Sequence, residues 1–233
     1  YFIKSTEKGF IVNKDYKDKD YTKKDLKELL NFLLQENTYI VQPYVRSKTK
    51  SGVIFDFRLH AQKNGEGKWV ITAIYPRIAA EGTIITNINN GGYTNYLLPF
   101  LLQEFDEEEA YNIKKTLEYF TLSLAKHLDQ LQMLEYSEVI DEIGIDVGLD
   151  ENQKLWIYEV NWRPGCPPAF YLELDVVKNT IQYAIYLAKN HERIKQEILQ
   201  FKRKDLEKRR IPIIAVTGSA GKTTTKSFIS SIL

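Results

Sequence analysis

The chain has 233 residues, of which 43% are hydrophobic and 27% are charged, as in an ordinary globular protein. A net charge of +1 excludes the global excess of Lys and Arg that a dedicated nucleic-acid binder needs, so we expect no nucleic-acid partner. We find no signal-peptide pattern, and no apolar run approaches the length of a membrane span. The single cysteine, Cys166, excludes an intramolecular disulfide, and we expect a cytoplasmic protein.

Periodicity and turn residues predict a mixture of short strands and longer helices. The expected elements, in chain order, are strands at 2–4 and 10–12, a charged loop, a helix from 22 to about 34, strands at 39–45, 54–62 and 68–79, a helix at 106–133, strands at 142–149 and 154–161, and a helix from 175 to about 210. Thr22 and Asp25 have the spacing of a capping box at the start of the first helix. Residues 189–210 are rich in Lys, Arg and Glu, and we interpret them as an inter-domain connector.

The strands at 142–149 and 154–161 flank a polar turn and carry the most informative chemistry. If they pair symmetrically about this turn, Asp146 lies opposite Glu159, and Asn161 follows on the same face because side chains alternate. The other face then holds only apolar and aromatic residues, with Ile145, Val147 and Leu149 opposite Val160, Tyr158 and Trp156. The predicted register is therefore self-consistent.

Three oxygen-bearing side chains converge in this register beside Gly144 and Gly148, which we expect to leave room for a bulky ligand. No Lys or Arg lies opposite the two carboxylates within the hairpin, so they repel one another unless a cation lies between them. Oxygen ligands suit Mg²⁺, which shares its coordination shell with phosphate oxygens and water. The alternative is a hairpin whose polar face is simply solvated.

At this point the sequence resembles a family. Asp146, Glu159 and Asn161, followed by Pro164 and Gly165, match the magnesium-binding pattern of ATP-grasp enzymes, including the separation of 13 positions between Asp and Glu. Further motifs resemble those of RimK-like ligases, and more closely those of the YheC/YheD-like proteins: Phe55-Asp56-Phe57-Arg58, Tyr75-Pro76-Arg77-Ile78-Ala79, Thr86-Asn87 and Gly91-Gly92. The resemblance extends from Tyr39 to Lys189.

The resemblance implies an α+β ATP-grasp fold, in which helices flank an antiparallel sheet. It also implies ATP and Mg²⁺ as cofactors, with Asp146, Glu159 and Asn161 as metal ligands. It further implies that Arg58 and Arg77 stabilise the transferring phosphoryl group or the acyl phosphate, and that Asn87 lies near the same oxygens. The Gly165 N–H would help to hold a tetrahedral intermediate. The hinge that contacts adenine would be formed by Gln42, Pro43, Tyr44 and Val45. One departure is Gly144, because some members of the family carry a catalytic Arg at that position. Arg58, Arg77 or Arg163 would have to supply the charge.

A second phosphate-binding motif lies near the end of the sequence, after the apolar residues 213–216. It consists of Thr217, Gly218, Ser219, Ala220, Gly221, Lys222, Thr223 and Thr224. Glycines let backbone N–H groups surround an anion, the Lys reaches the outer phosphates and Thr223 ligates Mg²⁺; the alternative is a chance Gly-rich turn. Val216 replaces the first glycine of the generic P-loop, and the motif resembles that of Mur ligases of the MurF type.

We therefore expect an incomplete ATP-grasp domain at 1–188, a helical connector at 189–210 and the start of a Mur ligase ATP-binding domain at 211–233. The sequence begins at Tyr1 without Met and ends one helix after the phosphate-binding motif, so we expect a chain truncated at both ends and inactive alone. This arrangement resembles the cyanophycin synthetases. It implies an ATP-dependent carboxylate–amine ligase that acts through an acyl phosphate on amino-acid or peptide-like substrates.

Three alternatives remain open. The ATP-grasp site can serve a phosphotransferase that uses no amine. The domain can be a non-catalytic nucleotide-binding module, such as a spore-coat component. In a cell-wall precursor ligase, the Mur part can perform the chemistry while the ATP-grasp part is accessory.

Other reactive residues receive no functional role. Cys166 lies among prolines, and no His is near in sequence to activate it. His60, His127 and His191 lack metal-ligand spacing. The basic residues between 202 and 210 are interleaved with Asp205 and Glu207, which favours a solvated helix over a binding patch.

Overall fold

The structure is a computed structural model that describes residues 1–14, 17–80, 86, 91–165 and 172–209. The chain divides into two compact units, which are treated separately below. The first comprises Tyr1–Lys126 and Asp141–Tyr186, and the second comprises His127–Ile140 and Leu187–Leu233. The sheets and all described residues of the predicted ATP-grasp site lie in the first unit.

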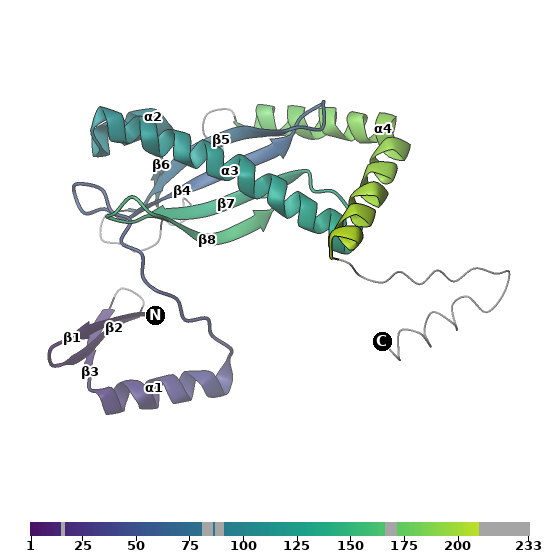
Figure 1. Ribbon diagram of the computed structural model, residues 1–233. Coiled ribbons are helices and arrows are strands. Elements are labelled where there is room, and N and C mark those ends of the chain that lie inside the picture. Colours follow the sequence, from purple (N-terminus) through teal and green to yellow (C-terminus); the bar gives the residue numbers. More distant parts are fainter. Residues whose placement is uncertain (15–16, 81–85, 87–90, 166–171, 210–233) are drawn as a thin grey trace, which may run out of the picture. The chain divides into compact units, whose positions relative to one another are not determined.

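A small antiparallel sheet forms the start of the first unit (Figure 1). Its strands, β1 (Phe2–Thr6), β2 (Gly9–Lys14) and β3 (Lys17–Tyr21), follow one another in the sheet as they do in the chain. The predicted charged loop after β2 is wrong, because its residues form β3. Charged residues are compatible with this strand because it lies at an edge, where its side chains reach water and Asp18 accepts a 2.7 Å hydrogen bond from Asn13.

Helix α1 (Lys23–Glu36) follows β3 and confirms the predicted capping box. The Asp25 backbone N–H donates to Thr22 Oγ1 at 3.2 Å, and the Thr22 N–H donates to Asp25 Oδ2 at 3.3 Å. These bonds satisfy N–H groups that the first helical turn leaves without partners.

After α1, residues 37–47 have no regular secondary structure, so the strand predicted at 39–45 is wrong. The prediction rested on the apolar residues Ile40 and Val41, whose side chains are 90% and 93% exposed. None of the strands that the structure describes pairs with them, and an apolar sequence alone does not form a strand.

The main sheet has five antiparallel strands in the order β6-β5-β4-β7-β8. These are β4 (Phe55–Lys63), β5 (Trp69–Ile78), β6 (Tyr93–Thr94), β7 (Glu142–Leu149) and β8 (Leu155–Trp162). The four longer strands lie within one or two residues of their predicted positions. β4 and β7 are central, so their side chains are almost completely buried, whereas β8 is an edge strand and partly exposed.

One face of the main sheet packs against helices (Figure 1). The rings of Phe55 and Phe57 meet Phe100 of helix α2 (Leu97–Glu104) at centroid distances of 5.0 and 6.0 Å. Helix α3 (Glu107–Tyr136) buries a stripe at helical spacing, namely Ala110, Ile113, Leu117 and Thr121. Helix α2 was not predicted, because its apolar run is too short to show helical periodicity.

Side chains of β4 alternate between the two faces of the sheet. Its aromatic and aliphatic residues point toward the helices, so its polar residues share the opposite face. Asp56, Arg58, His60 and Gln62 share this face. At its far end Gln62 donates to the Val176 carbonyl and to Thr180 Oγ1, both at 3.2 Å. These bonds attach the first part of helix α4 (Leu172–Arg209) to the sheet. Helix α4 is kinked at Asn190, close to the start of the predicted connector.

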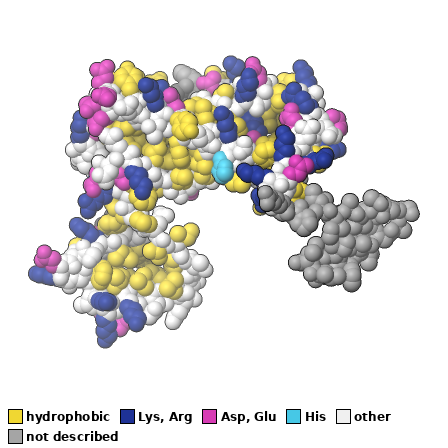
Figure 2. Space-filling model, in the orientation of Figure 1, with side chains coloured by type: hydrophobic (Ala, Val, Ile, Leu, Met, Phe, Trp, Pro, Cys, Tyr) yellow, Lys and Arg dark blue, Asp and Glu magenta, His cyan; other side chains and the backbone are white. Residues whose placement is uncertain are grey.

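The face shown in Figure 2 carries charged side chains of both signs, interspersed among hydrophobic ones. This mixture agrees with the net charge of +1. Among the helices that the structure describes, none combines the length and the apolar character that a membrane crossing requires.

Candidate functional site: a charged cluster on the main sheet

The site is organised by the pairing of β7 with β8. Asp146 lies opposite Glu159 and Gly144 lies opposite Asn161, as predicted. A β-bulge after Asp146 then shifts the register, so Val147 pairs with Ile157 and Leu149 with Leu155. The predicted partners Tyr158 and Trp156 are therefore wrong for these two positions. The bulge inserts one extra residue into β8, which symmetric pairing about the turn cannot anticipate.

Asp146 has a cationic partner from the strand on its other side. β4 also pairs with β7 and places Arg58 directly opposite Asp146. Arg58 donates from Nε to Asp146 Oδ1 at 2.5 Å and from Nη2 to Oδ2 at 3.1 Å. The two side chains are only 12% and 5% exposed. The expectation that no Arg faces the carboxylates is therefore wrong for Asp146, because it considered the hairpin without its neighbouring strand.

A second arginine reaches the same carboxylate. Arg77 Nη2 lies 3.0 Å from Asp146 Oδ2, while its Nε and Nη2 donate to Asp56 Oδ1 and Oδ2 at 2.7 and 2.8 Å. Burial disfavours the charged guanidinium, but the hydrogen bonds and charges of Asp56 and Asp146 outweigh it and raise the pKa of Arg77. Arg77 is therefore a fixed cation at any pH at which the protein is folded.

Asp56 and Thr86 complete this charged cluster, which we define as Asp56, Arg58, Arg77, Thr86 and Asp146. The Thr86 hydroxyl donates to Asp56 Oδ2 at 2.5 Å. Both residues lie in sequence motifs that we noted, yet neither received a role. The signal for Asp56 was its spacing of two residues from Arg58, which places both side chains on one face of the strand.

Glu159 and Asn161 lie beside the charged cluster, on the exposed edge strand. Asn161 Nδ2 donates to Glu159 Oε1 at 2.9 Å, and Glu159 forms no ion pair with any residue that the structure describes. Glu159, the Asn161 side-chain oxygen and the neighbouring Asp146 are oxygen donors of the kind that Mg²⁺ prefers. Among the described residues, no three His, Cys, Asp or Glu side chains gather closely enough to hold a metal ion by themselves, either here or at another place. Mg²⁺ needs only one or two carboxylates when it binds with phosphates, so the residues fit this ion.

The two glycines beside the carboxylates accommodate the protein's own side chains rather than an open space. A Cβ at Gly144 would lie 2.4 Å from Pro164 Cβ, and a Cβ at Gly148 would lie 2.0 Å from the Tyr158 hydroxyl oxygen. The predicted room for a bulky ligand at these positions is therefore wrong. Burial, followed by the charges of Asp56 and Tyr44, raises the pKa of Tyr158 to about 12.

Other predicted residues are placed less directly. Gly165 is exposed, and a Cβ there would meet no atom of the described residues within 4 Å. Arg163 is exposed, with a positive φ of 51°, and belongs to no ion pair with the described residues. Arg58 and Arg77, not Arg163, therefore contact Asp146.

The predicted hinge residues Gln42 and Tyr44 are exposed and Val45 is half-buried, all within the irregular segment before β4. The Tyr44 ring meets Phe2 edge-on at a centroid distance of 4.7 Å. Burial raises the pKa of its phenol, despite the opposing charge of Arg46. None of the contacts described for these residues tests whether they bind adenine, so the role of the hinge stays a prediction.

Some predicted site residues lie outside the described residues. These are Asn87, Cys166 and the whole phosphate-binding motif from Gly218, Ser219, Ala220, Gly221 and Lys222 to Thr223 and Thr224.

His60 lies next to the charged cluster on the same face of β4 and was given no role. It is fully buried, and its Nε2 lies 2.7 Å from Glu142 Oε1. Its Nδ1 has no hydrogen-bond partner within the described part of the chain. The His60–Glu142 pair is a second side-chain link between β4 and β7, beside the link between Arg58 and Asp146. It supports the rigidity of the cluster.

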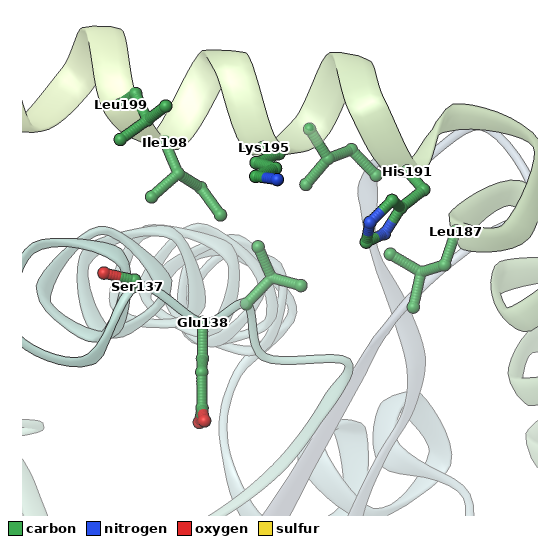
Figure 3. Close-up of a pocket in the computed structure, with 9 residues that line it drawn as sticks. Ser137, Glu138, Leu187, His191, Lys195, Ile198 and Leu199 are labelled. Atoms are coloured by element: carbon green, nitrogen blue, oxygen red, sulfur yellow. The ribbon is translucent and has the colours of Figure 1, made fainter. Parts of the chain in front are cut away.

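The second unit contains a cavity of about 610 Å³ that includes none of the predicted site residues (Figure 3). It lies between the residues that follow α3 and the part of α4 from Leu187 onward. Its lining comprises Ser137, Glu138, Val139, Leu187, His191, Ile194, Lys195, Ile198 and Leu199. The lining is mainly apolar, with His191 and Lys195 at its edge, and it offers no pair of carboxylates for magnesium.

Comparison of the sequence with those of known proteins identifies the family of the chain. The endospore coat-associated protein YheD of Bacillus subtilis (strain 168) is 28% identical over 200 residues, which cover 81% of this chain and 42% of YheD. The endospore coat-associated protein YheC of the same strain is 23% identical over 130 residues, or 56% of this chain and 34% of YheC. The chain thus spans less than half the length of these relatives. The profile of the YheC/D like ATP-grasp family matches residues 1–187, and the chain belongs to this family.

Proposed function

We propose that the protein is an ATP-dependent carboxylate–amine ligase that forms amide bonds through an acyl phosphate. The observation that carries the proposal is the charged cluster beside Glu159. Two largely buried arginines converge on Asp146, and the carboxylate of Glu159 lies across the strand pair without a cation among the described residues. Membership of the ATP-grasp family supports ATP as the phosphoryl donor.

The residues divide the chemistry between them. In the first step a substrate carboxylate oxygen attacks the γ-phosphorus of ATP, which gives an acyl phosphate and ADP. In the second step an amine attacks the acyl carbon, and phosphate leaves with that carboxylate oxygen. Bound magnesium would neutralise phosphate charge in both steps, with Glu159, Asn161 and Asp146 as its protein ligands.

The arginines would stabilise the transferring group. Arg58 and Arg77 both use Nε and Nη2 for carboxylates, and the Nη1 groups have no partner among the described residues. Neither Nη1 is used by the described residues, so its two N–H groups would be the donors to phosphoryl or acyl-phosphate oxygens. Because both guanidinium groups are already fixed by carboxylates, little reorganisation is needed when charge develops.

We also propose that the phosphate-binding motif at 217–224 begins a second, Mur-type ATP site, with Lys222 on the phosphates and Thr223 on magnesium. The sequence order of apolar strand, Gly-rich loop and helix supports it. The corresponding proposed domains are 1–188, 189–210 and 211–233. Amino-acid or peptide-like carboxylates and amines are the proposed substrates, and the cytoplasm is the proposed location.

The test is ADP release by the full-length protein with Mg–ATP and a mixture of the common amino acids and short peptides. Ligation predicts that ADP release requires an amine and that Glu159→Gln lowers it about a hundredfold. A stable phosphorylated product formed without an amine would instead identify a phosphotransferase. Lys222→Ala, measured in parallel, distinguishes one working site from two.

A second candidate is a nucleotide-binding module without catalysis. It is favoured by the names of both relatives, which are endospore coat-associated proteins. It predicts that the full-length protein binds Mg–ATP and releases no ADP with any mixture of carboxylates and amines.

A further inference from the structure

The first part of helix α4 exposes an apolar stripe on the side that faces away from the main sheet. The side toward the sheet includes Tyr183, which is 4% exposed and accepts a 3.4 Å hydrogen bond from Lys63 of β4. With 3.6 residues in each turn, positions 174, 177, 181 and 185 lie together on the opposite side. Four large apolar residues occupy these positions and are 70%, 53%, 55% and 48% exposed, namely Leu174, Val177, Ile181 and Ile185. All of them belong to the first unit.

The stripe has the spacing of a helix that packs against a second helix. Leu174 and Val177 are three residues apart, and Ile181 follows four residues later. This is the a–d–a spacing of the seven-residue repeat, in which positions a and d form the seam between paired helices. A helix that only covers a core carries polar residues on its outer side, and contiguous exposed apolar residues mark interaction sites. The stripe therefore indicates a partner helix.

Two charged residues that border the stripe indicate which helix fits it. With Leu174 and Ile181 at a positions, Glu173 occupies a g position and Lys178 occupies an e position. Both side chains are exposed, and neither forms an ion pair with any residue that the structure describes. When identical helices pair in parallel, a g residue of one lies beside the e residue of the other that is five positions later. Glu173 of each copy would then lie beside Lys178 of the other.

Antiparallel pairing would not bring these charges together. In that arrangement e positions lie beside e positions and g positions beside g positions, so Glu173 and Lys178 of two copies would not meet. The parallel arrangement gives two identical ion pairs across a twofold axis, which is the self-complementarity that a homodimer requires.

We propose that the stripe is the contact surface of a homodimer in which the first parts of two α4 helices pair in parallel. The apolar seam supplies the affinity, while the two Glu173–Lys178 pairs select a second copy of the chain and set the orientation. The seam spans only about three turns of helix, so the dimer is weak and depends on concentration. None of these residues belongs to the charged cluster, and the inference does not depend on the proposed function.

The experiment is sedimentation equilibrium of the full-length protein between about 1 and 200 µM, a range that suits the weak association of a small interface. The wild type should show a concentration-dependent equilibrium between monomer and dimer. Ile181→Glu should raise the dimer dissociation constant at least about tenfold, because it places two unpaired carboxylates in the seam. Leu102→Glu is the matched control, because Leu102 is an apolar residue of helix α2 that is 44% exposed. It should leave the dissociation constant unchanged.

Charge reversal tests the partner and the orientation. Glu173→Lys places lysines side by side at both contacts and Lys178→Glu places glutamates there, so each variant should raise the dissociation constant about tenfold. In an equimolar mixture of these two variants, every contact again joins a Lys to a Glu, and the mixture should associate about as tightly as the wild type.

Three results would overturn the proposal. A wild type that stays monomeric over the whole range would show that another segment or another protein covers the stripe. A dimer that Ile181→Glu leaves intact, or that Leu102→Glu weakens equally, would place the contact elsewhere. Failure of the mixture to regain affinity would exclude the parallel pairing of two α4 helices.

Discussion

Arg58 and Asp146 face each other across the central strands β4 and β7, and the guanidinium donates to both carboxylate oxygens, at 2.5 and 3.1 Å. This pair is buried in the middle of the main sheet, and Arg77 joins it from β5. Glu159, on the edge strand beside it, is exposed. The two proposed metal-binding carboxylates therefore differ in their physical situation, and their variants should behave differently.

Asp146→Asn should destabilise the fold strongly. It removes the negative charge that compensates two buried guanidinium groups, and breaking a buried pair in this way costs about 3–5 kcal/mol. Urea denaturation of the full-length protein measures the loss. Glu151→Gln, in the exposed turn between β7 and β8, is the control and should change stability by less than about 0.5 kcal/mol. Equal stability of the two variants would contradict the buried network.

Glu159→Gln should separate activity from stability. The Glu159 side chain is exposed and accepts one hydrogen bond, from Asn161, so the unfolding free energy should change by about 0.5 kcal/mol or less. Loss of the proposed magnesium ligand should lower amine-dependent ADP release about a hundredfold. A variant that unfolds as Asp146→Asn does, or that retains full ADP release, would show that Glu159 is not a ligand.

Gly144→Ala should be more costly than Gly148→Ala. The new Cβ at position 144 would lie 2.4 and 2.8 Å from ring atoms of Pro164, which is buried and rigid, and such overpacking costs about 1–3 kcal/mol. At position 148 the clash is with the far end of Tyr158, a partly exposed side chain that can rotate away.

Thermal and urea unfolding of the two alanine variants provide the comparison. If Gly148→Ala were the less stable of the two, Tyr158 would be more rigidly held than its exposure indicates.

Tyr158 should make stability fall at high pH. Its pKa is about 12 in the folded protein, raised by burial and by the charges of Asp56 and Tyr44, whereas an unfolded tyrosine ionises near pH ~10. The unfolded chain therefore loses this proton first, and the stabilising contribution, complete below about pH 10, is lost as the pH rises toward 12.

Urea denaturation of the wild type and of Tyr158→Phe at several pH values between 9 and 11.5 provides the measurement. The unfolding free energy of the wild type should fall more steeply than that of the Phe variant. Parallel curves would show that the Tyr158 phenol titrates normally.

The hairpin that carries Asp146 and Glu159 could be predicted from sequence because alternation on two strands and a short polar turn leave one register that buries the apolar face. The bulge at Tyr158 could not, since one extra residue changes neither the alternation near Asp146 nor the composition of the strand. It is visible only when Leu155 and Ile157, rather than Trp156 and Tyr158, are found opposite β7.

The charged cluster was less accessible to sequence reasoning because its members are distant in the chain. Arg58 and Arg77 were identified only through the family resemblance, and their shared contact with Asp146 depends on the strand order β5-β4-β7. That order follows from long-range pairing, which local patterns do not contain. Asp56 was given no role, because an acidic residue on a predicted strand is expected to be solvated. Only the pairing of β4 with β5 shows that Arg77 lies opposite it.

The most direct test of the proposed ligase is oxygen transfer from the substrate carboxylate. The full-length protein is incubated with Mg–ATP and a mixture of amino acids labelled with ¹⁸O in their carboxylates, and the released phosphate is analysed by mass spectrometry. An acyl phosphate predicts that phosphate released during amide formation carries one ¹⁸O atom, and that Glu159→Gln yields none. Unlabelled phosphate, released at the same rate with and without the amino acids, would contradict the account.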